Sequence, residues 1–358
     1  MTEQHDISRK PRIEFIDLAK GICILLVVQF HVAQETGAYD PDCWFSILTR
    51  NLRMPLYYLL SGMFFKNYGG FFLTALKKFN KLMIPFFFFI LLAYIAFQLP
   101  ARAYQGDDLI PSSLGSAYHW FISLNDSVWF LFSLFLINLL FFPIVVHVRN
   151  EWLRLAIVAA LAASAPPICK ILNINVITSV FNCIPFFYLG WLSARRSDFL
   201  YRHIRKRHLI LFSMCCIALA ALIISLTGGL KFDPIAPCAS PSGILLYTSA
   251  TLLVAGLLAI CKAIVSLPLI SWVGRYSIIL LGTHRIFLYM TATFMSFIGK
   301  YVSIEKDILF FWPLLFIITI ACCCIAIPVL RKYFPKFCAQ EDLIPLPQKI
   351  TPKTCIHE

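Results

Sequence analysis

Charged residues are scarce in this sequence. Only 14% of its 358 residues are charged, and no more than 18 are acidic, whereas about a quarter of the residues in a typical soluble domain carry charge. Hydrophobic residues make up 59% of the chain, and the mean hydropathy is +0.78. This composition excludes an ordinary soluble domain and indicates an integral membrane protein.

The sequence also lacks the pattern of a cleavable signal peptide. The first apolar run begins near Phe15, follows several basic residues and continues for about 19 residues, which is too long for the apolar region of a signal peptide. No cleavage site of small residues comes after it. We therefore expect this run to be the first transmembrane helix.

No Cys and His spacing typical of a zinc site is present. The 13 cysteines fall mostly within apolar runs, such as Cys215-Cys216, where a free Cys packs as a small hydrophobic residue. We expect neither a disulfide framework nor a metal site. Internal repeats and low-complexity tracts are missing too, so we predict one membrane domain (14–330), preceded by a cytoplasmic segment (1–13) and followed by a basic cytoplasmic tail (331–358).

Long apolar runs are the dominant positive feature. A transmembrane helix needs roughly 20 mainly apolar residues, and only helices or closed barrels satisfy their backbone groups in lipid. The sequence predicts an all-α polytopic bundle of about ten membrane helices. They are roughly 14–34, 44–65, 82–99, 127–147, 152–167, 174–194, 209–227, 243–263, 273–297 and 308–330.

The distribution of basic residues predicts the orientation of these helices. With a cytoplasmic N-terminus, most of the 31 Lys and Arg residues fall on the cytoplasmic side, as the positive-inside rule requires. Both termini are then cytoplasmic, and the net charge of +13 has a topological cause, so we expect no nucleic-acid partner. The same basic loops could also attract a phosphate-rich donor such as coenzyme A.

Ionisable residues inside predicted spans are costly and mark candidate functional sites. In the first span, Lys20 and His31 are 11 residues apart, which places them on one face of a helix and about 16 Å apart along its axis. Asp17 lies on a neighbouring face and is expected to pair with Lys20. A cation and an imidazole therefore face what we expect to be one shared tunnel across the membrane.

The second span places two more cations near the depth of His31. Arg50 and Arg53 lie about 9 and 13 Å below Trp44, while His31 lies about 5 Å below the outer end of the first span. Such a group suggests an anionic or strongly polar ligand, although Arg50 could instead extend to lipid headgroups and His31 could simply bridge helices. His284 and Arg285 in the ninth span are further candidates.

Several segments resemble the acyltransferase 3 family of membrane acyltransferases. The first helix contains Asp17, Lys20-Gly21, and His31 after ten intervening residues, where the family usually has Arg at the position of Lys20. Four later segments resemble the family in the same order; they are MPLYYLLSGMFF (54–65, with Ser61), SVWFLFSLF (127–135, with Trp129), FYLGWLSA (187–194) and WVGRYSIILLGTH (272–284).

The resemblance implies an enzyme that moves acyl groups, often acetyl, from cytoplasmic acyl-CoA to hydroxyls of sugars in surface polysaccharides or glycolipids. Some members of the family carry an additional hydrolase-like domain, which this sequence lacks, and in this respect it resembles the stand-alone sugar O-acetylases. That resemblance implies a multi-pass protein of the bacterial cytoplasmic membrane. Donor binding is then expected at Lys20 and Asp17, and catalysis at His31, Arg50 and Arg53. His284, Arg285, Ser61 and Trp129 are additional candidates, and no metal is expected.

In this hypothesis His31 takes the hydroxyl proton as general base or carries the acyl group transiently, and an arginine stabilises the oxyanion. The main alternative is a secondary transporter or flippase for a polar or lipid-linked sugar, in which the same charges would line a substrate path. No matched halves are visible in the sequence. A sensor or scaffold without chemistry would leave the aligned Lys20 and His31 unexplained.

Overall fold

The computed structural model describes residues 12–98, 127–172, 174–196, 200, 202–235, 243–298 and 308–346, and its regular elements over these ranges are all helical. The elements are α1 (Glu14–Glu35), α2 (Trp44–Met63), α3 (Phe71–Lys78), η1 (Phe79–Met83), α4 (Ile84–Ala93), η2 (Tyr94–Gln98), α7 (Trp129–His147), α8 (Glu151–Ala163), α9 (Ala165–Leu172), α10 (Asn175–Arg196), α11 (Lys206–Leu226), α12 (Gly243–Ile264), α13 (Pro268–Arg275), α14 (Ser277–Ile298) and α15 (Ile308–Tyr333).

The predicted all-α polytopic bundle is confirmed. Within the described ranges, nine helices are long and apolar enough to cross a membrane. Helix α2 is not one of them although it has 20 residues, because Arg50, Asn51 and Arg53 lower its hydropathy. It packs nevertheless against α1, α10 and α12, and so occupies the place of the second predicted span.

Three predicted boundaries were wrong. The third span does not begin at residue 82, because α3, a π-helical turn (η1) and α4 continue one another from Phe71. The fifth does not end at Pro166-Pro167: both prolines lie in the first turn of α9, where a missing backbone N–H costs little. The ninth is interrupted at Tyr276, between α13 and α14.

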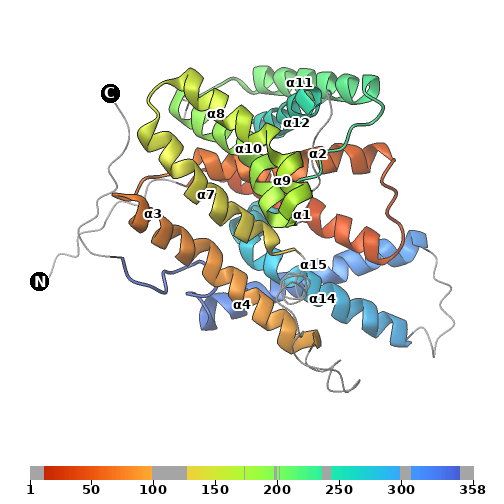
Figure 1. Cartoon of the computed structure of the whole chain (residues 1–358). Helices are drawn as coiled ribbons and strands as arrows, with labels where there is room; N and C mark the ends of the chain where they lie inside the picture. The colour runs from red at the N-terminus through yellow and green to blue at the C-terminus, as the bar shows by residue number, and fades with distance from the viewer. Residues whose placement is uncertain are drawn as a thin grey trace, which may run out of the picture.

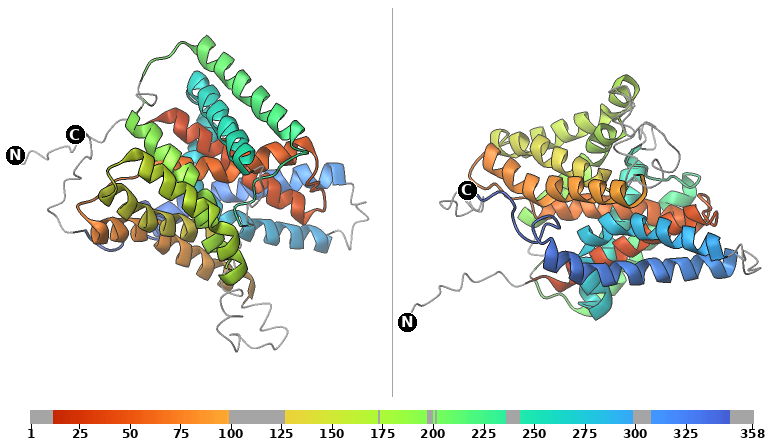
Figure 2. Two further views of the ribbon diagram at one scale, coloured as in Figure 1. Left: turned by 45° about the horizontal axis from the view of Figure 1, so that its top comes forward. Right: turned by 90° about the horizontal axis from the view of Figure 1, so that it is seen from below.

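Helix α1 lies in the interior of the bundle. It contacts α2, α12, α13, α14 and α15, and Figures 1 and 2 show it between the α11–α12 pair and the α14–α15 pair. Helix α11 packs mainly on α12, at the periphery, and most of its side chains face outward. Asp17, Lys20 and His31 of α1 are therefore buried or partly buried among other helices, which removes them from lipid.

Glycines allow two close helix crossings around α1 and α2. A Cβ atom on Gly62 of α2 would collide with the backbone of Phe187 on α10, and one on Gly190 of α10 would collide with the backbone of Leu59 on α2. Gly21 of α1 and Gly274 of α13 form a second such contact through Ile270 and Asp17. Small residues let membrane helices approach closely, and these two crossings fix α1 and α2 within the bundle.

Charged side chains gather at one end of the bundle, which we call the basic end. Arg12 and Arg275 both approach the Asp17 carboxylate, at 2.6 and 3.7 Å, and the Arg331 guanidinium lies 4.3 Å from the Tyr276 ring. The start of α1 and the end of α15 therefore lie at the same end. The positive-inside rule predicts that this end faces the cytoplasm.

The segment after α15 folds back onto the basic end. Asp342 forms ion pairs with Lys77 at 2.5 Å and Lys81 at 3.1 Å. The buried Asn80 side chain both donates to the carbonyl of Ile344 and accepts from its amide, each at 2.9 Å. This segment, residues 334–346, is thus tied to α3 and η1 by charge and by hydrogen bonds.

Candidate functional site

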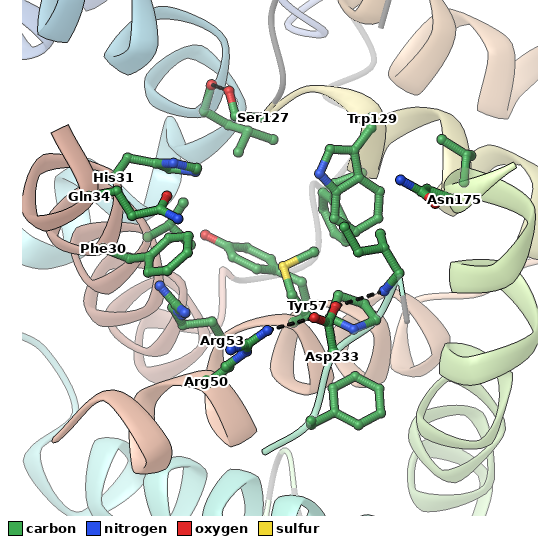
Figure 3. A pocket seen from close by; sticks show the side chains of 18 residues that line it. Phe30, His31, Gln34, Arg50, Arg53, Tyr57, Ser127, Trp129, Asn175 and Asp233 are labelled. Carbon is green, nitrogen blue, oxygen red and sulfur yellow. Dashed lines mark hydrogen bonds and ion pairs between the residues drawn. The ribbon is translucent and has the colours of Figure 1, made fainter. Parts of the chain in front are cut away.

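A cavity of about 500 Å³ lies toward the opposite end of the bundle. We call it the His31 cavity. Its walls come from α1, α2, α7, α10, α14 and the segment after α11, and the polar side chains among them are His31, Gln34, Arg50, Arg53, Tyr57, Ser127, Asn175 and Asp233. Figure 3 shows His31 and Gln34 on one side of this space and Trp129 and Asn175 on the other. A cavity of this size, largely apolar with a few polar groups, is typical of a small-molecule site.

The structure brings the three residues predicted for catalysis to this one cavity. His31 is partly buried on α1, one turn from Gln34. Arg53 of α2 is 6% exposed, and its guanidinium lies 4.0 Å from the centre of the Phe30 ring. Arg50 lies one turn earlier on α2 and lines the same cavity.

The two arginines differ in their partners. Arg50 forms an ion pair with Asp233 at 2.5 Å, so a carboxylate balances its charge. Arg53 has no carboxylate partner in the described part of the chain, and its guanidinium donates a long hydrogen bond to the Leu26 carbonyl at 3.5 Å. A buried cation without a counter-ion favours a negatively charged or negatively polarised ligand.

A second cavity of about 250 Å³ lies nearer the basic end. We call it the Lys20 cavity. Lys20 and Lys78 contribute its cations, and Ser61 and Ser277 contribute hydroxyl groups. The Lys20 ammonium lies 5.7 Å from the Phe64 ring, and no carboxylate pairs with it in the described ranges. This cavity is therefore basic, and suits an anionic or strongly polar group.

The expected single tunnel is instead divided into these two cavities. Tyr57, Phe130 and Leu281 line both of them and form the partition between them. The Tyr57 hydroxyl donates to the Lys20 carbonyl at 3.2 Å, and the Tyr57 and Phe130 rings are 5.5 Å apart. Lys20 and His31 do share a face of α1, as predicted, but they open into different cavities because large side chains of α2, α7 and α14 lie between them.

Asp17 forms its ion pairs with arginines. It is 5% exposed, lines neither cavity, and pairs with Arg12 and Arg275, while its charge interacts with Lys20 only from beyond ion-pair distance. The i−3 spacing made a pair with Lys20 possible, but two guanidiniums from outside the helix reach the carboxylate. Its contacts are those of a residue that joins the start of α1 to α13.

The remaining candidates separate into cavity and non-cavity positions. Trp129 lines the His31 cavity and Ser61 the Lys20 cavity. His284 is completely buried beside His31, with the two ring centres 5.3 Å apart. Arg285 is 9% exposed and donates to the Tyr289 hydroxyl at 2.5 Å.

Sequence reasoning missed several residues of both cavities. Asp233 lies in a loop segment, where an acidic residue gives no periodic signal, and only its pairing with Arg50 reveals its place. Lys78 falls between the predicted spans 44–65 and 82–99, whereas in the structure it is the last residue of α3, which continues into η1 and α4. Tyr57 could have been found as a candidate, because it is one of the two tyrosines of the segment 54–65.

The chemistry of these cavities is that of proton transfer and charge stabilisation. Within the described ranges, no three His, Cys, Asp or Glu side chains come together as a metal site would require. An imidazole can accept a proton or act as a nucleophile, and a nearby guanidinium can stabilise a developing oxyanion.

Comparison with known proteins assigns the chain to a family. The family model described as an acyltransferase domain, that of the acyltransferase 3 family, matches residues 13–329, which is nearly the whole chain. Neither the search of curated proteins nor the search of solved structures gives a match. The chain therefore belongs to the acyltransferase 3 family and is a multi-pass membrane acyltransferase.

Proposed function

We propose that this acyltransferase moves an acyl group, with acetyl as the expected group, from cytoplasmic acyl-CoA to a hydroxyl of a sugar in a surface polysaccharide or glycolipid. We place it in a bacterial cytoplasmic membrane. The observation that carries the proposal is the pair of adjoining cavities: the basic Lys20 cavity, and the His31 cavity with its imidazole and two guanidiniums. Family membership supports acyl transfer itself.

The Lys20 cavity is suited to the donor. Coenzyme A carries phosphates at one end and a thioester at the other, so it needs cations near its entry and a path inward for its pantetheine arm. Lys20 and Lys78 supply the cations, near the end that the positive-inside rule assigns to the cytoplasm. The thioester can then approach the partition formed by Tyr57, Phe130 and Leu281.

The His31 cavity is suited to a sugar acceptor. Trp129 and Phe130 offer aromatic faces, and Asn175, Gln34 and Asp233 offer hydrogen-bonding groups. Apolar surface with a few placed polar groups orients a small polar ligand. An acceptor held between Trp129 and His31 would present its hydroxyl to the imidazole.

The reaction follows from these positions. The acceptor hydroxyl transfers its proton to neutral His31 as its oxygen attacks the thioester carbon, and a C–O bond forms. The oxyanion that develops on the carbonyl lies near Arg53, whose charge no carboxylate in the described part of the chain balances, and low-dielectric surroundings strengthen this interaction. The C–S bond then breaks, and the coenzyme A sulfur takes the proton from His31, so the histidine is restored.

The test uses membranes of cells that express the protein, supplied with radiolabelled acetyl-CoA. We expect base-labile label in the glycan or glycolipid fraction, and a loss of about 10²- to 10⁴-fold for His31→Ala, the usual contribution of a general base. Wild-type labelling by His31→Ala at equal expression would refute the assignment of His31. Purified protein that neither binds nor hydrolyses acetyl-CoA would instead support a transporter.

A further inference from the structure

Two histidine rings meet at the edge of the His31 cavity. His31 on α1 and His284 on α14 have ring centres 5.3 Å apart, with 39° between the ring planes. His31 lines the cavity, whereas His284 is 0% exposed and lines neither cavity. His284 therefore supports the His31 ring from the interior of the bundle and does not touch a ligand in the cavity.

Each ring carries one buried nitrogen without a hydrogen-bond partner in the described part of the chain: Nδ1 of His31 and Nε2 of His284. A buried polar atom left unpaired costs about 1–3 kcal/mol. A ring nitrogen lies a little over 1 Å from the ring centre, so nitrogens that faced each other across this pair would be about 3 Å apart, a normal hydrogen-bond length. The structure as it stands does not form this bond, and a rotation of the rings would bring the two atoms together. The two unpaired atoms can satisfy each other.

The backbone contact of His284 determines which nitrogen donates. Nδ1 of His284 lies 3.0 Å from the Leu280 carbonyl oxygen. A carbonyl oxygen can only accept, so this Nδ1 carries the proton, and Nε2 of the neutral ring is left with a lone pair. His31 must then supply the hydrogen to a bond between the rings, from its Nδ1.

We propose that His284 is a positioning residue for acyl transfer, whose Nε2 accepts a hydrogen bond from Nδ1–H of His31 and so keeps the Nε2 lone pair of His31 directed into the cavity. The inference rests on the proposed function and adds a second histidine to it. It assigns to His284 the part that the carboxylate plays in a serine–histidine–aspartate triad, which is to fix the tautomer and orientation of the base.

The bond helps at the step at which His31 is protonated. The hydroxyl proton arrives at Nε2 of His31, and the positive charge is shared with Nδ1–H, which remains bonded to the lone pair of His284. When the C–S bond breaks, the proton leaves Nε2 for the coenzyme A sulfur. No atom of His284 is consumed, and the two rings return to their starting state.

The other groups around His31 make a neutral acceptor useful. Arg53 from α2 and Arg285 from α14 are the cations close enough to interact with the His31 ring, and Gln34 lies beside it on α1. Both cations oppose a positive charge on His31 by Coulomb repulsion. The Gln34 side chain hydrogen-bonds to the His31 ring, and the lone pair of neutral His284 would be a second partner that favours a transient imidazolium at this position.

The test compares three variants in membranes supplied with radiolabelled acetyl-CoA. His284→Leu keeps the bulk but removes the acceptor, and His284→Gln returns an amide oxygen near the place of Nε2. Thr283→Val is the matched control, because Thr283 is also buried on the same turn, and within the described ranges its hydroxyl bonds to the Ile279 carbonyl and the Cys323 sulfur, not to a cavity residue. Expression and donor KM are measured for each protein.

We expect kcat of His284→Leu to fall by about 10- to 100-fold, the size of effect seen when the outer hydrogen-bond partner of a metal-bound histidine is removed, with an unchanged KM for acetyl-CoA. His284→Gln should recover most of kcat, and Thr283→Val should match the wild type. Wild-type kcat in His284→Leu would overturn the proposal, as would an equal loss in the Leu and Gln variants. If the wild type and Thr283→Val transfer no acetyl group, the proposed function itself is refuted.

Discussion

Arg53 and Arg50 should respond in opposite ways when each is replaced by methionine, a side chain of similar length without charge. Arg53 is 6% exposed and has no carboxylate partner in the described ranges. Its removal leaves no charge unpaired and ends the desolvation of a guanidinium, which costs several kcal/mol in a protein interior. The opposing effects are the loss of its contact with Phe30, worth up to about 2 kcal/mol, and of its long hydrogen bond to the Leu26 carbonyl.

We therefore expect Arg53→Met to be as stable as the wild type or more stable, and to lose about 10²- to 10³-fold in kcat, because removal of one oxyanion donor costs this much in other enzymes. Arg50→Met removes the ion pair between Arg50 and Asp233. Since both side chains are more than a quarter exposed, we expect a stability loss of only about 1 kcal/mol and a smaller loss of kcat.

The assay measures thermal unfolding of each purified variant in detergent and acetyl transfer in membranes at matched expression. The two variants should differ in what they lose. Arg53→Met should lose activity but keep its stability, whereas Arg50→Met should lose stability and only a small part of its activity. If Arg53→Met unfolded at a markedly lower temperature and kept the wild-type kcat, Arg53 would be a structural residue and the oxyanion role would be wrong.

Two further predictions concern the basic end. Lys20→Met should raise the KM for acetyl-CoA by about tenfold, the effect of losing one charge-assisted contact, with kcat little changed. Initial rates over a range of donor concentrations measure both constants, and an unchanged KM would mean that Lys20 does not bind the donor. Burial alone would raise the pKa of Asp342, but its hydrogen bonds and charge interactions with Lys77 and Lys81 outweigh burial, and the pKa lies below the ordinary 3.8. A carboxylate with a lowered pKa stabilises the docked segment 334–346 at neutral pH, and this stabilisation is lost as the pH falls below 3.8 through the pKa of the folded protein. Asp342→Asn should therefore speed hydrogen exchange of the Ile344 amide at pH 7. Equal exchange rates in the variant and the wild type would contradict this.

The sequence could predict the helices and the depth of their polar residues, because both depend on local pattern. Apolar length identifies a span, and the helical repeat places Lys20 and His31 on one face of α1. Depth along two antiparallel helices also brought Arg50 and Arg53 to the level of His31, and the structure places all three around one cavity. The roles of these residues stay predictions.

The rest depends on which helices are neighbours, and a single sequence does not specify this. The sequence alone does not show that His284 contacts His31, because this contact depends on the packing of α14 against α1. Asp17 could pair equally well with any nearby cation, and α13 supplies Arg275. The partition between the cavities requires side chains from α2, α7 and α14 at one point, so helical periodicity predicted an open tunnel where Tyr57 closes it.

The segments that resemble the family were informative for a reason that only the structure reveals. Gly62 and Gly190 belong to two of these segments and make the contact between α2 and α10, while Gly21 and Gly274 make the contact between α1 and α13. Such glycines are required where backbones approach closely. The resemblance therefore identifies packing positions as well as candidate reactive residues.

The most direct measurement uses inverted membrane vesicles, in which the cytoplasmic face is outward and the native acceptors remain on the inner side. Radiolabelled acetyl-CoA, which does not cross the membrane, is added outside. If the acyl group passes from the Lys20 cavity to an acceptor in the His31 cavity, base-labile label will appear on glycan or glycolipid inside the vesicles, and His31→Gln will abolish it. Label that stays outside, or label that reaches the interior at the wild-type rate in His31→Gln, would contradict the account.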